Sequence, residues 1–126
     1  MEKSLFFTQS KQVLIIGFGR FGKLITTILL EKTNTSIIVL TSKNHPKKNQ
    51  RLTFINTWKN IPQVELIIPC VPIYAFEKNI IQIAENIKHP CICLDVCSVK
   101  KHPVQIMKRH LPKFIKIVSY HKMFRH

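Results

Sequence analysis

The fold is decided by the stretch Val13-Leu14-Ile15-Ile16-Gly17-Phe18-Gly19-Arg20-Phe21-Gly22. An apolar run leads directly into the pattern G-x-G-x-x-G, and a helical pattern follows it. This order predicts a buried strand, a tight turn and the start of a helix, as in a βαβ unit that binds a dinucleotide. In such a unit the unpaired N–H groups of the helix N-terminus face the phosphates.

Glycine is scarce in this chain, which makes the pattern more specific. The sequence has three glycines, and all three belong to it. Average usage of about 7% would give roughly nine in a chain of this length. An ordinary glycine turn is therefore the minor alternative. We predict that the whole loop binds the cofactor, through Gly17, Phe18, Gly19, Arg20, Phe21 and Gly22.

The rest of the βαβ unit follows at once. Apolar residues recur three and four positions apart after the glycines, which predicts an amphipathic helix with this face in the core: Phe21, Leu24, Ile25, Ile28 and Leu29. Asn34 is expected to end the helix in the left-handed conformation. The continuous apolar run at residues 36–40 predicts a second strand, buried on both faces of a parallel sheet.

The end of the second strand bears on the choice of cofactor. An acidic residue there would bind the ribose of NAD, whereas a cation accommodates the additional phosphate of NADP. The chain has Thr41-Ser42-Lys43 and no acidic residue, with further positive charge at Lys47, Lys48 and Arg51. We therefore predict that Ser42 and Lys43 bind NADP, with NAD as the second choice. The alternative is that Lys43 is a solvated loop residue.

Four more strands are expected, near residues 52–56, 64–68, 91–96 and 114–119, with helices starting at Ile73 and Pro103. Strands that alternate with helices predict an α/β, Rossmann-like doubly wound fold: a mostly parallel six-stranded sheet with helices on both faces. Cys70, Val71 and Pro72 follow the fourth strand at its carboxyl end. Because the ligand crevice of such sheets lies at this edge, these three residues are expected to face the cofactor.

Length and composition bound the organisation. A chain of 126 residues has room for one domain, and we expect a single NAD(P)-binding Rossmann domain over 1–126 with an N-terminal arm at 1–11. Apolar runs are too short for a membrane span, and the N-terminus lacks the pattern of a secretory signal. We therefore expect a cytoplasmic protein with no membrane partner.

Charge and cysteine content raise two further possibilities. Twenty Lys and Arg against six Asp and Glu give a net charge of +14, which suits a polyanion partner. The sequence does not show the alternating aromatic and basic residues of a known nucleic-acid-binding module, so nucleic-acid binding is the less favoured interpretation.

The four cysteines fall on or beside expected strands, as reduced core thiols do, and their spacing matches no common zinc site. No metal is predicted.

Later motifs add a resemblance. After the glycine loop and Val71-Pro72 come Asp95-Val96-Cys97-Ser98-Val99-Lys100 and His121-Lys122-Met123-Phe124. With these motifs in order, nearly the whole chain resembles the nucleotide-binding half of prephenate and arogenate dehydrogenases. The loop is similar to the family's G-F-G-x-F-G, and the later motifs to D-V-x-S-V-K and H-P-M-F. Ser42-Lys43 approximates the Ser-Arg of plant-type arogenate enzymes.

The resemblance implies an NAD(P)-dependent oxidoreductase that oxidatively decarboxylates prephenate or arogenate in tyrosine biosynthesis. It implies that His121 accepts or polarises the hydroxyl proton of the substrate, which a neutral imidazole near pH 7 can do. It further implies that Ser98 and Lys100 bind the substrate, with Ser98 also catalytic. On the residues alone, an ordinary surface histidine is the favoured interpretation of His121, and Ser98 could simply cap the following turn.

Departures from the family leave alternatives open. The proline that follows the family's histidine is Lys122 here, and the family's helical C-terminal domain is absent from this sequence. That domain supplies dimer contacts and groups for the substrate carboxylates, so we expect a separate helical domain or a homodimer as partner. The alternative is a non-catalytic dinucleotide-binding module or a truncated relic of the enzyme. A polyanion-binding basic protein is less favoured.

Overall fold

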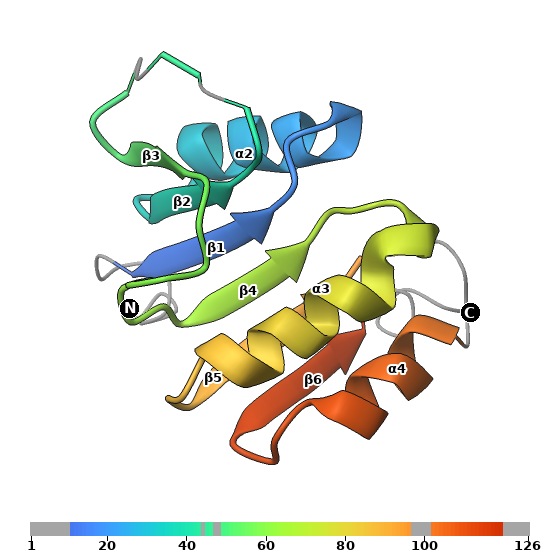
Figure 1. The fold of residues 1–126 in the computed structure, drawn as a ribbon. Helices are drawn as coiled ribbons and strands as arrows, with labels where there is room; N and C mark the ends of the chain where they lie inside the picture. The colour runs from blue at the N-terminus through green and yellow to red at the C-terminus, as the bar shows by residue number, and fades with distance from the viewer. Residues whose placement is uncertain (1–10, 44, 47–48, 97–101, 120–126) are drawn as a thin grey trace, which may run out of the picture.

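The computed structural model describes residues 11–43, 45–46, 49–96 and 102–119. Its six strands form one sheet in the order β3-β2-β1-β4-β5-β6, and every described pair is parallel (Figure 1). The elements are, in chain order, β1 (Gln12–Ile16), α2 (Arg20–Lys32), β2 (Ser36–Leu40), β3 (Leu52–Ile55), β4 (Leu66–Pro69), α3 (Ile73–Asn86), β5 (Cys91–Asp95), α4 (His102–His110) and β6 (Ile115–Ser119). The predicted α/β doubly wound fold is confirmed.

The strand order reverses between β1 and β4. From β1 the chain proceeds to β2 and β3 on one side, whereas β4, β5 and β6 continue on the other. Ile16, at the end of β1, is in register with Leu40 of β2 and Pro69 of β4. The loops after β1 and β4 therefore separate at the same edge of the sheet. Ligands of open α/β sheets bind at this kind of switch point.

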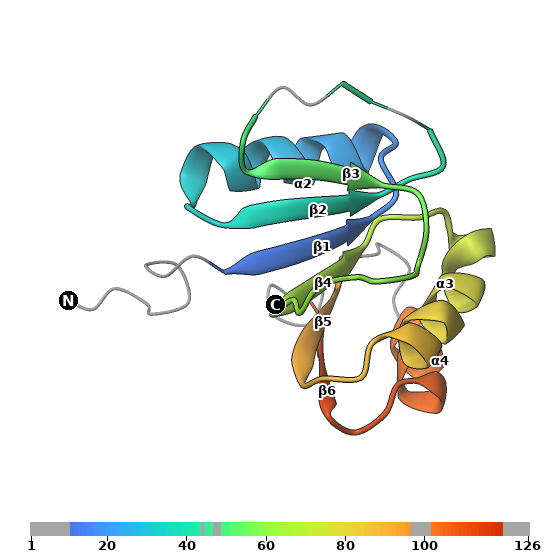
Figure 2. The same ribbon diagram turned by 60° about the vertical axis from the view of Figure 1, so that its left-hand side comes forward.

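Helices cover both faces of the sheet, but unequally (Figure 2). On one face lies α2, against β1 and β2. On the opposite face α3 and α4 pack together over the β4 to β6 half. Side chains of the central strands alternate between two cores, one with Leu14, Phe76 and Met107 and the other with Val13 and Ile15. The strands β4 to β6 are thus covered by α3 and α4 on the face of the sheet opposite α2.

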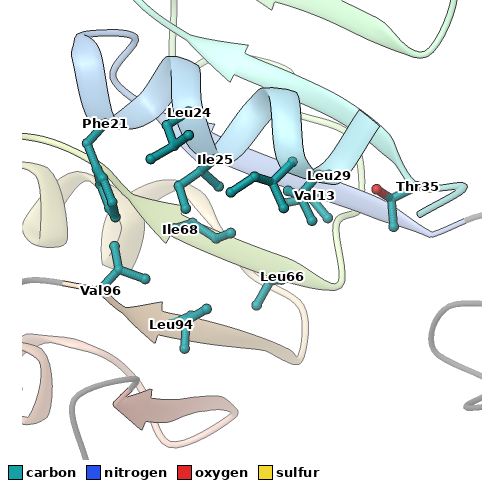
Figure 3. A pocket seen from close by; sticks show the side chains of 11 residues that line it. Val13, Phe21, Leu24, Ile25, Leu29, Thr35, Leu66, Ile68, Leu94 and Val96 are labelled. Atoms are coloured by element: carbon teal, nitrogen blue, oxygen red, sulfur yellow. The ribbon is translucent and has the colours of Figure 1, made fainter. Parts of the chain in front are cut away.

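The apolar stripe of α2 is not buried as predicted. Phe21, Leu24 and Ile28 are 44%, 52% and 44% exposed, and the fully buried residues of this helix are Gly22 and Thr26. These small residues let α2 approach β1 and β2, while the larger side chains extend towards β4 and β5 (Figure 3). Ile73, which begins α3 as predicted, is likewise 45% exposed. Periodicity predicted which side chains share a face, but not what that face meets.

The end of α2 also differs from expectation. Asn34 is not left-handed, because Asn60 is the non-glycine residue with positive φ among those described. Instead, Thr33 adopts an extended conformation, and its N–H and hydroxyl both donate to the Leu29 carbonyl, at 3.0 and 2.7 Å. A hydroxyl thus satisfies the terminal carbonyl that a left-handed residue would otherwise have capped.

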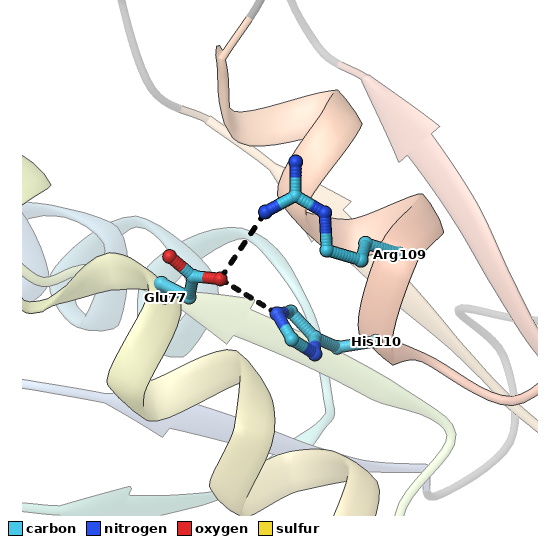
Figure 4. A network of polar contacts seen from close by, with 3 residues as sticks. All are labelled: Glu77, Arg109 and His110. Atoms are coloured by element: carbon cyan, nitrogen blue, oxygen red, sulfur yellow. Dashed lines mark hydrogen bonds and ion pairs between the residues drawn. The ribbon is translucent and has the colours of Figure 1, made fainter.

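A small polar network joins the two helices of the α3–α4 face (Figure 4). Glu77 of α3 accepts from Arg109 of α4 at 3.4 Å and contacts His110 Nε2 at 2.7 Å. The hydrogen bond with His110 is the main cause that lowers the pKa of Glu77 below its usual value.

None of the described helices has the length and apolar character that crossing a membrane requires.

Candidate functional site

The turn after β1 requires glycine at its first position. Gly17 has φ +100°, and its N–H donates to the Leu40 carbonyl of β2 at 2.8 Å. A Cβ added here would lie 2.4 Å from the Cys70 carbonyl oxygen. Both the conformation and the close approach of the β4 loop therefore exclude a side chain.

The other two glycines differ in what surrounds them. A Cβ on Gly22 would lie 2.4 Å from the Gly17 carbonyl oxygen, so Gly22 allows α2 to pack against the turn. A Cβ on Gly19 would meet no described atom within 4 Å. Gly19 precedes α2 in an ordinary extended conformation, and no described side chain caps the helix there. The first-turn N–H groups of α2 thus remain available beside an open space, as an anion site requires.

This open space is part of a cleft of about 470 Å³ at the switch point. Its walls come from the carboxyl ends of four strands: the glycine loop after β1, Thr41 and Ser42 after β2, Asn56 after β3, and residues 70–72 after β4. Backbone bonds from Thr41 N to the Ile55 carbonyl and from Cys70 N to the Ile16 carbonyl continue the sheet into these loops. The cleft is therefore held by the rigid edge of the sheet. Trp58 and Asn79 complete its lining.

A second hollow of about 400 Å³ adjoins the cleft on the β2 side, since both are lined by Phe18, Gly19, Thr41 and Ser42. Its remaining lining residues are Lys23, Lys43 and His45. The His45 ring contacts Phe18 and Phe54, each at 4.8 Å between centroids, and Phe18 contacts Phe54 at 5.0 Å. The Lys23 ammonium lies 5.7 Å from the centre of the Phe18 ring. Two lysines and an aromatic cluster thus surround this hollow.

The structure brings most of the predicted cofactor residues together. Eight of them line the cleft or its neighbour: Gly17, Phe18, Gly19, Ser42, Lys43, Cys70, Val71 and Pro72. Gly22 lies behind the turn, Arg20 is exposed at the first residue of α2, and the Phe21 ring points to the other side of this helix (Figure 3). The predicted catalytic and substrate residues Ser98, Lys100 and His121 lie outside the described residues.

Several lining residues were missed by the sequence analysis. Thr41 and Asn56 directly follow β2 and β3, so the rule that ligands bind at carboxyl strand ends could have identified them. Lys23 lies one turn into α2, on the side of the helix that faces Phe18. His45 and Trp58 lie in irregular segments, for which periodicity gives no orientation. No sequence signal assigned these two residues to the site.

Arg51 does not contribute charge to the site as predicted. Its guanidinium donates to three backbone carbonyls around the end of α2, those of Leu30 at 2.6 Å, Thr33 at 3.0 Å and Thr35 at 2.8 Å. This position is at the amino end of β3, opposite the edge that bears the cleft. Arg51 therefore satisfies helix carbonyls and does not face the hollow beside Ser42.

The cysteines of β5 are parts of the core. Cys91 and Cys93 are buried. Burial, with Glu65 nearby, raises the pKa of Cys91 to about 11, and burial raises the pKa of Cys93 further. Both thiols therefore stay protonated near neutral pH. Among the described residues, no three His, Cys, Asp or Glu side chains form a group that could hold a metal ion.

Comparison with known families adds an independent line of support. Residues 26–125 match the family model described as prephenate dehydrogenase, nucleotide-binding domain. The chain belongs to this family. The match begins within α2, so the glycine-loop geometry and the match to the prephenate dehydrogenase family rest on different residues. Together they describe a Rossmann-type nucleotide-binding domain of this dehydrogenase family.

Individual relatives of this prephenate dehydrogenase domain are distant. A protein of Methanocaldococcus jannaschii named "Probable arogenate/prephenate dehydrogenase" is 28% identical over 60 residues, which cover 48% of this chain and 14% of that protein. Among solved structures, the Rex-family repressor RSP has a TM-score of 0.63 at 13% identity, covering 94% of this chain and 56% of the repressor. Shikimate dehydrogenase 1 of Peptoclostridium difficile has a TM-score of 0.58 at 18% identity, covering 90% and 42%.

These structural likenesses concern the fold. The chain spans 56% of the repressor and 42% of the shikimate dehydrogenase, and the matched part spans 14% of the curated dehydrogenase. The shared region is the parallel sheet with its helices, which a repressor and dehydrogenases both use. The assignment to the prephenate dehydrogenase family therefore depends on the family model, and the site depends on the geometry of the cleft.

Proposed function

We propose that the cleft binds the dinucleotide NADP and that the chain is the nucleotide-binding part of a prephenate or arogenate dehydrogenase. One observation supports this proposal most directly. Gly19 leaves an open space at the uncapped N-terminus of α2, where the sheet order reverses. A diphosphate needs a close approach to backbone N–H groups, and a Cβ at this position would occupy that approach. The residues of this chain therefore fit the group.

The proposed preference for NADP rests on the hollow beside the cleft. Lys23 and Lys43 line it together with the Ser42 hydroxyl, and no carboxylate is among its described lining residues. Two cations and a hydroxyl suit a ribose 2′-phosphate, whereas a ribose hydroxyl would need an acceptor. The neighbouring Phe18 ring offers an apolar surface for the adenine. NAD is the second candidate.

The proposed catalytic residues are those of the family motifs, Ser98 and His121, with Lys100 as a substrate-binding residue. Asp95 ends β5 and is in register with Ser119, which ends β6. Ser98 follows the first of these strand ends by three residues, and His121 follows the second by two. Both segments thus begin at the sheet edge that bears the glycine loop, which supports their assignment to the same site.

The proposed reaction divides the chemistry between cofactor and protein. The bound nicotinamide supplies a hydride acceptor. His121 accepts the proton of the substrate hydroxyl as the ring carbon that carries it is oxidised and carbon dioxide leaves. Ser98 orients that hydroxyl by a hydrogen bond, and Lys100 pairs with a substrate carboxylate. A helical domain, separate or from a second copy, completes the substrate side, while residues 1–126 form the single cofactor-binding unit.

Turnover of the chain with NADP and either prephenate or arogenate tests this proposal, with reduced nicotinamide as the readout. We expect Ser98→Ala and His121→Ala to lose turnover and to keep the affinity for NADP measured by calorimetry. Lys78→Ala, an exposed position on α3, is the matched control and should retain both. Binding without turnover, also after addition of a helical partner domain, would favour the non-catalytic module. Absence of dinucleotide binding would contradict the proposal.

A further inference from the structure

The His45 ring lines the hollow beside the cleft and contacts two other aromatic side chains. Its centroid is 4.8 Å from that of Phe18 in the glycine loop, at an interplanar angle of 73°, and 4.8 Å from that of Phe54 in β3, at 32°. Phe18 and Phe54 also contact one another, with 5.0 Å between centroids. Aromatic pairs favour separations of this size. The glycine loop and β3 therefore hold the ring in place together.

The ring nitrogens of His45 are not used by the described part of the chain. The two aromatic contacts are the interactions that the described residues make with this ring, and no described group forms a hydrogen bond with it. A neutral imidazole has one N–H donor, and an imidazolium has two. The side chain is half-buried, so a ligand in the hollow can reach it. The hollow thus contains a donor that a ligand can satisfy.

The surroundings of this ring suit an anion. Lys23 and Lys43 line the same hollow together with the Ser42 hydroxyl, and none of its described lining residues is acidic. The Lys23 ammonium lies 5.7 Å from the centre of the Phe18 ring, so it is on the side of α2 that faces the aromatic cluster. A phosphate monoester carries more than one negative charge near pH 7 and has three acceptor oxygens. Such a group can accept from the lysines, the hydroxyl and the imidazole at once.

We propose that His45 donates a hydrogen bond to the ribose 2′-phosphate of NADP and is a specificity-determining residue for this cofactor. The inference rests on the proposed function, and it assigns the choice of cofactor to a residue beyond Ser42 and Lys43. NAD has an uncharged hydroxyl at the same position, which accepts a weaker hydrogen bond. Phe18 and Phe54 already hold the ring, so binding costs it little conformational freedom.

Stacking of the ring on the adenine is the competing role. The adenine is common to NADP and NAD, so stacking would contribute equally to the affinity for both cofactors. Donation to the 2′-phosphate contributes to the affinity for NADP alone. The two lysines beside the ring favour the second role. The ratio of the two affinities therefore distinguishes the roles.

Calorimetric titration of NADP and of NAD into His45→Phe tests the proposal, because phenylalanine retains an aromatic ring and has no N–H donor. We expect NADP affinity to fall about tenfold and NAD affinity to stay within about twofold of the wild type. His45→Gln, which has a donor and no ring, should retain more of the preference for NADP. The matched control is His110→Phe, at a half-buried histidine that contacts Glu77 on the α3–α4 face, and it should leave both affinities unchanged.

Nuclear magnetic resonance of the imidazole provides a second measurement, on the wild-type chain. The ring ¹⁵N signals of His45 are assigned by their absence from the spectrum of His45→Gln. We expect them to shift when NADP is added to saturation and to stay nearly unchanged with NAD.

The outcomes separate this inference from the proposed function. An unchanged ratio of NADP to NAD affinity in His45→Phe, with equal ¹⁵N shifts for both cofactors, would overturn the role of His45. Equal losses of affinity for both cofactors would overturn it in favour of adenine stacking. A wild-type chain that binds neither dinucleotide would contradict the proposed function itself, and the role of His45 with it.

Discussion

Residues 17–28 serve two surfaces of the molecule, and these surfaces differ in chemistry although both are open. The end of α2 meets the cleft with backbone N–H groups, Gly19 and the nearby Ser42 and Thr41. The side of the same helix, with Phe21, Leu24 and Ile28, forms one wall of a groove of about 500 Å³ against β4 and β5 (Figure 3). One surface offers hydrogen-bond donors, and the other is mostly hydrocarbon, with Thr35 as the polar residue in its lining. Exposure identifies both as sites, and the lining chemistry decides what each can bind.

The largest effect is expected from the turn that separates the two surfaces. Gly17→Ala forces a Cβ to 2.4 Å from the Cys70 carbonyl in a conformation with φ +100°. Strain of this kind costs about 1–3 kcal/mol, a large part of the stability of a small domain. We expect the urea midpoint to fall sharply and dinucleotide binding to be lost. An unchanged midpoint would show that the turn is not built as described.

The next effect concerns the hollow beside the cleft. Lys43→Ala removes a cation next to the proposed 2′-phosphate, and a hydrogen bond to a charged group contributes about 1.5–3 kcal/mol, so NADP affinity should fall at least about tenfold. The affinity for NAD should stay within about twofold of the wild type, because NAD lacks that phosphate. Calorimetric titration of both cofactors is the measurement, with Lys78→Ala as control. Equal losses for both cofactors would refute the preference for NADP.

Phe21 sharpens the comparison, because it belongs to the glycine pattern and yet faces the groove. We expect Phe21→Ser to change NADP affinity less than about twofold, whereas substitutions at the cleft change it strongly. Fluorescence or calorimetric titration against the wild type provides the result. A loss as large as that of Lys43→Ala would mean that the two surfaces are not separate.

The smallest effect is expected on the covered face. In the fold, the hydrogen bond with His110 lowers the pKa of Glu77 below 4.5, so its contribution to stability is present above that pH. The contribution is lost as the pH falls through the lowered pKa of the folded state. Wild type should therefore be slightly more stable than Glu77→Gln near neutrality, and the difference should vanish in acid. Thermal melts of both proteins across this range are the check, and a difference that grows in acid would contradict it.

The sequence predicted the sheet well because apolar runs such as residues 37–40 and 91–94 are typical of buried parallel strands. It also predicted the glycine turn, since the pattern G-x-G-x-x-G is typical of a tight turn between a strand and a helix. It failed on the stripe of α2, because spacing identifies residues on one side of a helix but not what lies opposite them. Arg51 was misassigned for a related reason. Its partners are backbone carbonyls around the end of α2, and the residues next to Arg51 in the sequence do not indicate these partners.

Calorimetric titration of NADP into Gly19→Ala is the most direct test of the cleft. Alanine fits at this position without contacting any described atom, and Gly19 already has an ordinary φ of −78°. We therefore expect the variant to fold with stability equal to the wild type or about 0.4–1 kcal/mol higher, yet to lose measurable NADP binding, because the methyl group occupies the approach to the helix N-terminus. Wild-type affinity in a folded Gly19→Ala protein would contradict the assignment of this cleft to a dinucleotide.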